Sequence, residues 1–206
     1  SGVGDSLATR LRSAGARCTL VRRGEGYAES GDEIVLRADS EEDWSRLALA
    51  WKTGDQPQRV VYLWPVDHEE PGAVFAATTE MLRFSHTLDA LPPGVCPRVD
   101  VITRGGQPVG RGTVPVSPVQ GACLGLFRVI LGEHPHLPFR SIDLSADESP
   151  TTGAALWSEL SHRETEREVA LRGEARYVQR ITRGLGSPSR PWPAEQPLRL
   201  ESRERG

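Results

Sequence analysis

The segment Val60-Val61-Tyr62-Leu63-Trp64-Pro65-Val66-Asp67 is the stretch of sequence that decides the fold. Its first five residues form an apolar run of strand length, the pattern expected when helices cover both faces of a parallel sheet. Residues 101–107 (VITRGGQ) begin with a second apolar run, and residues 126–135 (LFRVILGEHP) read as the end of a helix. Strand-like and helix-like segments alternate along the chain, which predicts an α/β fold with a mostly parallel sheet flanked by helices.

The sequence ahead of this segment begins with a helix-to-strand step. Asp5 is expected to cap a helix that ends at Gly15, and a strand is expected over residues 16–21. Residues 24–31 are rich in turn formers and are expected to be a loop, followed by a short strand over residues 34–37. The chain therefore begins just after the point where a first strand of such a fold would end.

A second helix is expected to open at Ser40. Three acidic residues follow in its first turn, and Lys52 and Gly54 stand at its end, as the helix dipole and glycine C-caps favour. Its apolar face is formed by Trp44, Leu47, Ala48 and Trp51.

The rest of the chain continues the alternation. Ser117 and Gln120 form a capping box with Pro118 at the first helical position, and Gly132 closes that helix. The side chains expected to point inward from it are Val119, Ala122, Cys123, Leu126, Val129 and Ile130. The other elements are expected at 73–88 (helix), 99–103 (strand), 139–144 (strand), 153–161 (helix), and 168–172 with 176–181 (hairpin). This order predicts a doubly wound, Rossmann-like sheet.

Composition narrows the class of protein. The 206 residues carry a formal net charge of -3 with Arg and acidic residues interspersed, so a nucleic-acid partner is not expected. No apolar run is long enough to span a bilayer and no signal peptide is recognisable, so we expect no membrane partner and a cytoplasmic location. Cys18, Cys96 and Cys123 are an odd number at wide spacing, which predicts reduced thiols packed in the core.

Two regions are expected along the chain. Residues 1–183 form one domain, and residues 184–206 form a linker toward a following domain, because they are rich in Gly, Ser, Pro and Arg without periodicity. Trp192 is the residue of this tail that we expect to touch the domain surface.

Five segments in order resemble the structural, non-catalytic subdomain of a polyketide synthase ketoreductase. They are residues 60–67, 101–107, 126–135, 140–144 and 168–180, and the resemblance covers residues 2–183. It implies a truncated Rossmann-like fold of the short-chain dehydrogenase type with a C-terminal hairpin and an extended tail. It also implies that no cofactor binds to this segment, and that catalysis and NADPH binding belong to an associated catalytic reductase domain.

The sequence lacks the residues of a complete dinucleotide site and of ketoreductase chemistry. Gly2-Val3-Gly4 is the one candidate for a G-x-G-x-x-G turn, but its third glycine position is Leu7. A ketoreductase needs a tyrosine acid with a lysine four residues later. Tyr27, Tyr62 and Tyr177 are followed at that offset by Gly31, Val66 and Ile181. The single lysine, Lys52, is explained by its place at a helix end.

Other motifs also favour a structural interpretation. Gly4-Asp5-Ser6-Leu7 spells the nucleophile block of the GDSL hydrolases, but the chain has no asparagine and no Asp-x-x-His to complete that site, so Ser6 is expected to be an ordinary helix residue. His134 and His136 lack nearby metal ligands, and a helix C-terminal role is expected for the segment around His134. Trp44, Trp51, Trp64 and Trp157 are expected to pack in the core. We therefore expect no catalytic, cofactor-binding or metal-binding residues.

The sequence thus favours a structural subdomain in the reducing region of a modular type I polyketide synthase, a multifunctional enzyme. Its expected role is to stabilise and position neighbouring ketoreductase, enoylreductase, dehydratase or methyltransferase domains, with an acyl carrier protein as an indirect partner. Whether the region is an active or a pseudo-ketoreductase stays open. The alternative is an independent Rossmann-fold reductase or GDSL-type hydrolase that uses Ser6 or the glycines at the N-terminus.

Overall fold

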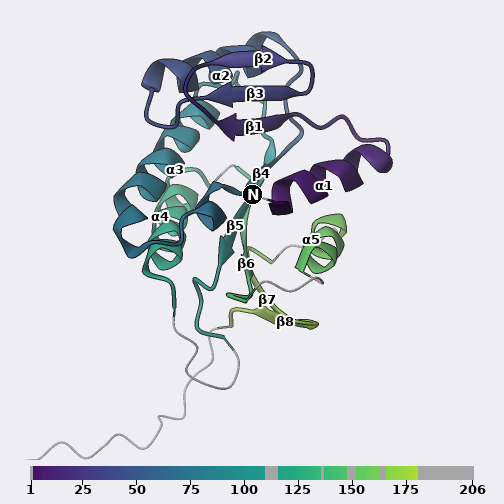
Figure 1. Ribbon diagram of the computed structural model, residues 1–206, viewed down its shortest axis with the longest axis vertical. Helices are drawn as coiled ribbons and strands as arrows, with labels where there is room; N and C mark the ends of the chain where they lie inside the picture. The colour runs from purple at the N-terminus through teal and green to yellow at the C-terminus, as the bar shows by residue number, and fades with distance from the viewer. Residues whose placement is uncertain (1, 110–115, 136, 148–151, 163–165, 181–206) are drawn as a thin grey trace, which may run out of the picture.

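A computed structural model describes residues 2–109, 116–135, 137–147, 152–162 and 166–180. Its strands stack along the long axis of the molecule, and helices lie on both sides of them (Figure 1). The α/β class and the mostly parallel pairing expected from the sequence are confirmed. The expected linker over residues 184–206, including Trp192, lies outside the described residues, as do His136 and Ile181.

The strands form two sheets where the sequence analysis expected one. The first sheet has the order β1-β3-β2, in which β1 (Leu20–Arg23) is parallel and β2 (Ala28–Ser30) antiparallel to β3 (Glu33–Leu36). The expected loop over residues 24–31 is wrong in part, because Gly31 has a positive φ of 56° and turns β2 back onto β3. The expected strand over residues 16–21 starts only at Leu20.

The second sheet has the order β4-β5-β6-β7-β8. Its first four strands are parallel: β4 (Arg59–Tyr62), β5 (Arg98–Arg104), β6 (Phe139–Leu144) and β7 (Glu168–Arg172). β8 (Ala175–Val178) pairs antiparallel with β7 across a turn at Gly173, so the expected hairpin is confirmed.

The end of the first expected strand is a correction. β4 ends at Tyr62, and Trp64 begins a short 3₁₀ helix, η1 (Trp64–Asp67), with Pro65 in its first turn. Proline has no N–H to donate to a sheet ladder, which explains why the strand cannot continue through this point. β4 is also the outermost strand of its sheet, not a central one.

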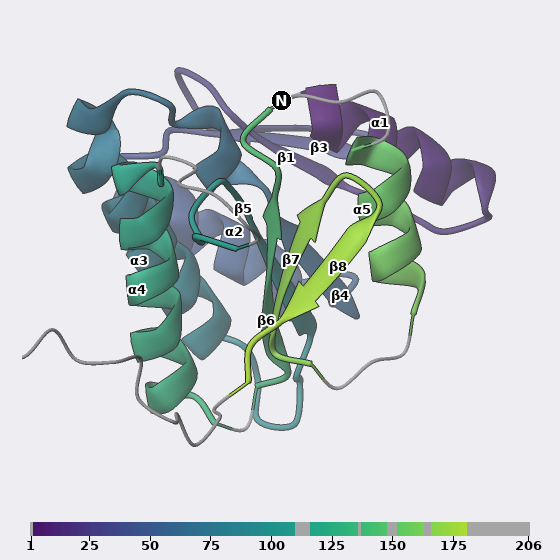
Figure 2. The same ribbon diagram turned by 90° about the horizontal axis from the view of Figure 1, so that it is seen from below.

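Helices cover the two sides of the second sheet (Figure 2). α3 (Val74–Asp89) and α4 (Pro118–Glu133) lie on one side, and α1 (Gly2–Ser13) and α5 (Thr152–Ser161) lie on the other. α2 (Glu41–Thr53) packs against α3, and a short 3₁₀ helix, η2 (Pro71–Ala73), leads into α3. α1 begins at Gly2, so Asp5 lies in its first turn and is not its cap.

Two apolar clusters form the core. The first includes the buried side chains of Trp44, Met81, Val101 and Phe127 and lies on the side of α2, α3 and α4. The second includes Leu7, Ile102, Ile142 and Leu156 and lies on the side of α1 and α5. No helix among the described residues has the length and apolar character required to cross a membrane.

The helix ends follow the sequence signals in most respects. Ser40 accepts a hydrogen bond from the N–H of Asp43, and Ser117 accepts one from the N–H of Gln120. The Gln120 side chain does not return to Ser117 as a full capping box requires, because it is bound to other backbone groups described below. Val129, expected to point inward, is 54% exposed.

Tryptophan and cysteine expectations are met in part. Trp44 and Trp64 are buried, and Trp51 and Trp157 are partly buried against the two clusters. Of the three thiols expected in the core, only Cys123 is buried there. Cys18 is partly exposed and Cys96 is exposed, so that expectation is wrong for Cys96.

Candidate functional site

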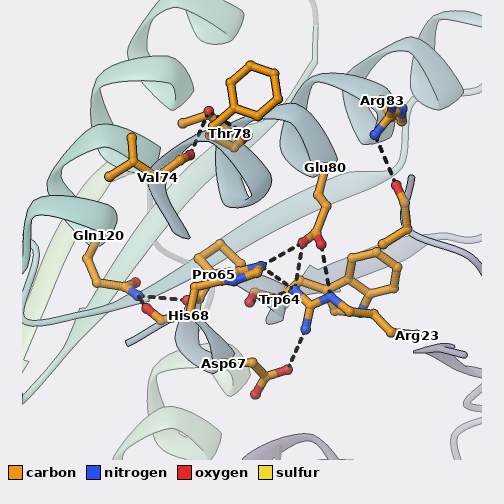
Figure 3. A network of polar contacts seen from close by, with 12 residues as sticks. Arg23, Trp64, Pro65, Asp67, His68, Val74, Thr78, Glu80, Arg83 and Gln120 are labelled. Atoms are coloured by element: carbon orange, nitrogen blue, oxygen red, sulfur yellow. Dashed lines mark hydrogen bonds and ion pairs between the residues drawn. The ribbon is translucent and has the colours of Figure 1, made fainter. Parts of the chain in front are cut away.

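Arg23, at the carboxyl end of β1, is the centre of a cluster of polar contacts (Figure 3). Glu80 of α3, which is 6% exposed, holds it through two bonds, from Nε to Oε1 at 3.2 Å and from Nη2 to Oε2 at 2.7 Å. Nη1 donates to Oδ2 of Asp67 at 3.0 Å, and Nη2 donates to the carbonyl of Trp64 at 3.0 Å. The Nε2 atom of His68 lies 2.9 Å from both Arg23 Nη2 and Glu80 Oε2. We call Arg23, Asp67, His68 and Glu80 the Arg23 cluster.

The Arg23 cluster ties three elements together. Asp67 is the last residue of η1 and His68 follows it, Glu80 belongs to α3, and Arg23 is the last residue of β1 in the first sheet. The Arg23 guanidinium also lies 4.5 Å from the centre of the Trp64 ring, a cation–π arrangement. The cluster therefore bridges the carboxyl ends of β1 and β4.

Gln120 fastens η1 from the opposite side. Its Nε2 donates to the carbonyls of Pro65 at 2.6 Å and His68 at 2.9 Å (Figure 3). Its Oε1 accepts from the N–H of Arg104 at 3.2 Å. One side chain thus joins η1, the end of β5 and the start of α4.

Asp143 of β6 is a second buried centre at the carboxyl edge of the sheet, with no exposed surface. Its Oδ1 accepts from the Thr103 hydroxyl at 2.6 Å and from the N–H of Gly106 at 2.8 Å. Its Oδ2 accepts from the N–H of Gln107 at 3.1 Å and from Nη2 of Arg172 at 2.5 Å. Each oxygen of the carboxylate thus accepts two hydrogen bonds from the chain itself, and these bonds hold the loop that follows β5 in place.

Glycines make that loop possible. Gly105 has a positive φ of 63°, which glycine adopts without strain. A Cβ on Gly106 would lie 2.7 Å from Leu124 Cδ1 and 3.1 Å from the backbone carbon of Gln120, so a larger residue there would have to displace the Leu124 side chain and part of α4. The two glycines of the VITRGGQ segment are therefore explained by backbone conformation and packing.

A third network lies at the amino end of the strands. Asp100, which is fully buried, binds Nε of Arg59 at 2.6 Å and also binds Arg140. Arg140 reaches Oε1 of Glu159 at 3.0 Å, and Nε of Arg176 donates to Oε2 of Glu159 at 2.8 Å. These ion pairs join the sheet to α5.

One surface groove of about 410 Å³ lies between α5 and the β7–β8 hairpin. Ala154, Ser158 and Gly173 line it, and the Glu159–Arg176 ion pair lies along it. Both carboxylate oxygens of Glu159 already accept from arginine, and His162 Nδ1 lies 2.5 Å from the Ser158 carbonyl of its own helix. Glu159 and the Nδ1 atom of His162 are therefore already engaged by other groups of the chain.

The glycine motif and the GDSL block at the N-terminus, which the sequence offered as candidate sites, do not take part in these networks. Gly2, Val3 and Gly4 form the first turn of α1, and Ser6 is an exposed residue of its second turn, a helix position as expected. Residues 2–4 thus form helix and not a phosphate-binding loop. The expectation that this segment binds no cofactor stays a prediction.

Tyr62 and the buried thiol of Cys123 are unsuited to acid–base or nucleophilic work. Burial raises the pKa of Tyr62 well above its ordinary value, and its ring stacks on Phe84 at 4.4 Å. Burial, and to a smaller extent Glu80, raises the pKa of the Cys123 thiol to about 11. Neither group therefore ionises near neutral pH.

His134 is the C-cap of α4, as expected, and its Nδ1 lies 3.2 Å from Oδ1 of Asp89 at the end of α3. In the part of the chain that the structure describes, no three His, Cys, Asp or Glu side chains gather in a way that could hold a metal ion.

Sequence reasoning missed the residues that organise the three networks: Arg23, Glu80, Asp100, Asp143 and Arg172. For Asp100 and Asp143 there was a local signal, since each is a lone acidic residue inside an apolar strand. A charge at such a position is almost always paired. Nothing in the sequence indicates which basic residues pair with Asp100 and Asp143.

Comparisons with known proteins agree on the fold. A family model described as "Polyketide synthase extender module SpnB, Rossmann fold domain" matches residues 10–181. Among curated proteins, no significant sequence match is found.

Solved structures of ketoreductases resemble the chain. An A1-type ketoreductase is 26% identical with a TM-score of 0.63, and the match covers 84% of this chain and 40% of that one. An A-type ketoreductase from a modular polyketide synthase is 27% identical with a TM-score of 0.59, covering 78% and 37%. A C2-type ketoreductase shares the fold at 24% identity and a TM-score of 0.62, covering 89% and 39%. The chain thus spans about two fifths of the length of these structures.

Proposed function

The chain belongs to the family of Rossmann fold domains of polyketide synthase extender modules, and we propose that it is a structural, non-catalytic subdomain of a reducing region. In this role it stabilises and positions a catalytic ketoreductase subdomain, together with neighbouring enoylreductase, dehydratase or methyltransferase domains. NADPH binding and reduction take place on the catalytic subdomain, and an acyl carrier protein is met only indirectly.

The observation that carries this proposal is the position of the Arg23 cluster. Open α/β sheets bind ligands in the crevice at the carboxyl ends of the strands where the strand order reverses. In this chain the parallel strands β1 and β3 follow one another toward one end of the stack, and β4 to β7 follow one another toward the other end (Figure 1). The strand order therefore reverses between β1 and β4. That crevice is spanned by the ion pairs of Arg23 with Asp67 and Glu80. A ligand there would have to break the partly buried ion pair of Arg23 with Glu80, which leaves a nearly buried carboxylate without its partner.

A second observation supports a docking role. Exposed large apolar side chains of the described residues gather on α3 and α4 or directly ahead of α4: Phe75 (81%), Leu82 (43%), Val116 (38%) and Val129 (54%). Phe75 and Leu82 are two helical turns apart and so share one face of α3. We call these four residues the α3–α4 face.

The α3 part of this face lacks the charges of an ordinary outer helix face, since the exposed residues of α3 from Phe75 to Leu82 are all apolar. On α4, Val129 has exposed Gly125 and Gly132 one turn away on either side, with exposed Arg128 and Glu133 near it. An apolar surface of this kind marks a contact with another protein surface. The catalytic ketoreductase subdomain is the partner that we propose for it.

Replacing Phe75 and Leu82 together by aspartate tests this docking. The double variant should fold normally, because both side chains are exposed, but should bind a separately produced catalytic subdomain of the same synthase about 100-fold more weakly. Analytical ultracentrifugation gives the affinity, and circular dichroism gives the Tm. Leu49→Asp is the matched control, since Leu49 is 57% exposed on α2 and should leave binding unchanged. Wild-type affinity in the double variant would rule out this face.

Titration with NADPH separates a structural subdomain from an independent reductase. Because the crevice between β1 and β4 is spanned by the Arg23 cluster, the chain should show no saturable binding tighter than about 1 mM. NADPH fluorescence and calorimetry provide the measurement, with an active ketoreductase as the positive control. Saturable binding in the micromolar range would favour the reductase instead.

A further inference from the structure

Arginines gather at the amino edge of the second sheet. Arg59 is the first residue of β4, Arg98 lies level with it as the first residue of β5, and Arg140 is the second residue of β6. Alternate residues of a strand share a face, so all three lie on the side of the second core cluster, which α1 and α5 cover. Arg167, which is exposed, directly precedes β7 and continues its ladder with β6. We call Arg59, Arg98, Arg140 and Arg167 the amino-edge arginines.

The two carboxylates within this group are already bound by arginines other than Arg98. Asp100 accepts from Nε of Arg59 at 2.6 Å through Oδ2, and from Arg140 through Oδ1. Glu159 of α5 accepts from Arg140 at 3.0 Å through Oε1, and its Oε2 accepts from an arginine of β8 at 2.8 Å. The Nε atom of Arg98 comes only within 4.0 Å of Asp100 Oδ1.

Positive charge is therefore in surplus at this edge. The amino-edge arginines bring four positive charges to two carboxylates, Asp100 and Glu159, which leaves a surplus of two even before Arg176 takes its share of Glu159. The last carbonyls of α5 accept from two of these arginines, but a helix C-terminus offsets only about half a charge. The neighbouring ion pair of Glu166 with Arg180 adds one charge of each sign and leaves the surplus unchanged.

Arg98 is the arginine at which an added negative charge would be most stabilising. Its side chain is 29% exposed, and its long contact with Asp100 is the one that its guanidinium makes among the described residues. Burial, and next the nearby charge of Arg140, lowers the pKa of Arg98 from its ordinary value. Beside it, the Nη2 atom of Arg59 is buried without a hydrogen-bond partner. A carboxylate brought to Arg98 would relieve the repulsion and accept from its N–H groups.

The length of the row indicates the kind of ligand. Neighbouring strands lie about 4.8 Å apart, so the row from Arg59 on β4 to Arg167 beside β7 is roughly 14 Å long. A single small anion is too short to reach both ends, whereas a polypeptide segment with several acidic side chains can. Arginine also binds carboxylates through two parallel N–H groups, which gives such a contact a defined geometry.

We propose that the amino-edge arginines form a docking surface for an acidic segment of another polypeptide. Arg98 is its anchor and binds a carboxylate of the partner, with Arg59 and Arg167 on either side, while the buried Arg140 holds the surface together from within. The helices of the α3–α4 face lie on the other side of the sheet (Figure 2). The docking surface is thus separate from that face, and the proposal is independent of the proposed function.

A fluorescein-labelled hexaglutamate peptide is the probe for this surface. Fluorescence anisotropy with the full chain should show saturable binding at an ionic strength of about 20 mM, where surface charges are weakly screened. A labelled serine–glycine peptide of the same length should not bind. The double variant Arg98→Gln/Arg167→Gln should bind hexaglutamate about 10-fold more weakly. The matched control Arg46→Gln/Arg83→Gln removes the same two charges from α2 and α3 and should keep the wild-type affinity.

The Tm of the free chain separates a docking arginine from a structural one. Arg98→Gln removes surplus charge and should leave the Tm unchanged or raise it, whereas Arg140→Gln should lower the Tm because it leaves Asp100 and Glu159 short of a partner. Equal hexaglutamate affinity in the two double variants would overturn the proposal, and so would a loss of Tm in Arg98→Gln as large as that in Arg140→Gln. Calorimetry that detected binding of inorganic phosphate, with hexaglutamate unbound, would assign the edge to a small anion and exclude the acidic partner.

Discussion

Asp143→Ala should cost about 3–5 kcal/mol of the free energy of unfolding, the range for removing one partner of a buried charge pair. The substitution leaves Arg172 without the carboxylate that holds its Nη2, and it leaves the N–H groups of Gly106 and Gln107 without acceptors. The total free energy of unfolding of a domain is about 5–15 kcal/mol, so the variant should be close to unfolding at 37 °C. Urea denaturation followed by circular dichroism measures the loss.

Two further variants make the result specific to the buried carboxylate. Asp143→Asn keeps an acceptor oxygen for the loop but removes the charge, so it should lose less than the alanine variant. Asp147→Asn changes an exposed carboxylate shortly after the same strand and should alter stability by no more than about 0.5 kcal/mol. An Asp143→Ala loss below about 1 kcal/mol would mean that the loop after β5 is held by other contacts.

Features that depend on neighbours in sequence were predictable. Ser40 and Ser117 cap helices because their hydroxyls reach an N–H three residues later, a contact that local spacing determines. The β7–β8 hairpin follows from two apolar segments joined at Gly173. The alternation of such elements was sufficient to predict the α/β class and the parallel pairing of β4 to β7.

Features that depend on distant residues were not predictable in the same way. Asp143 stands out as an acid within an apolar strand, but its partner Arg172 comes 29 residues later on another strand. Arg23 and Glu80 are 57 residues apart, and the sequence around each of them does not indicate that they form a pair. Gln120 was interpreted as the second half of a capping box, whereas tertiary contacts with η1 and β5 take its side chain away from Ser117.

The division into two sheets has the same origin. Each strand was recognisable from its own composition, but whether two strands pair depends on what lies between them. β1 and β4 are separated in sequence by β2, β3 and α2, and they follow one another in the stack of strands only in the folded chain (Figure 1). The sequence predicted that β4 is covered by helices on both faces. In the structure its residues Val60 and Val61 are only partly buried.

Trp64→Ala should lower the free energy of unfolding by roughly 3–5 kcal/mol, although Trp64 belongs to η1 and not to a strand as the sequence suggested. Its ring is 8% exposed, makes an edge contact with Trp44 at 5.2 Å and lies under the Arg23 guanidinium. Removing it leaves a cavity beneath the Arg23 cluster and frees the carbonyl of Val21. The Tm should fall by roughly 6–20 °C.

The Trp64→Phe variant separates the two parts of this effect, because it keeps most of the ring volume and loses only the indole hydrogen bond. It should cost about 1–2 kcal/mol, the scale of one hydrogen bond and a small change in packing. Trp157→Ala, at a partly buried tryptophan of α5, should cost less than Trp64→Ala because less of its surface is removed from water. If Trp64→Ala left the Tm unchanged, the ring would be dispensable for the contact between η1 and β1, and the Arg23 cluster and the other residues of the first core cluster would have to hold the two sheets together.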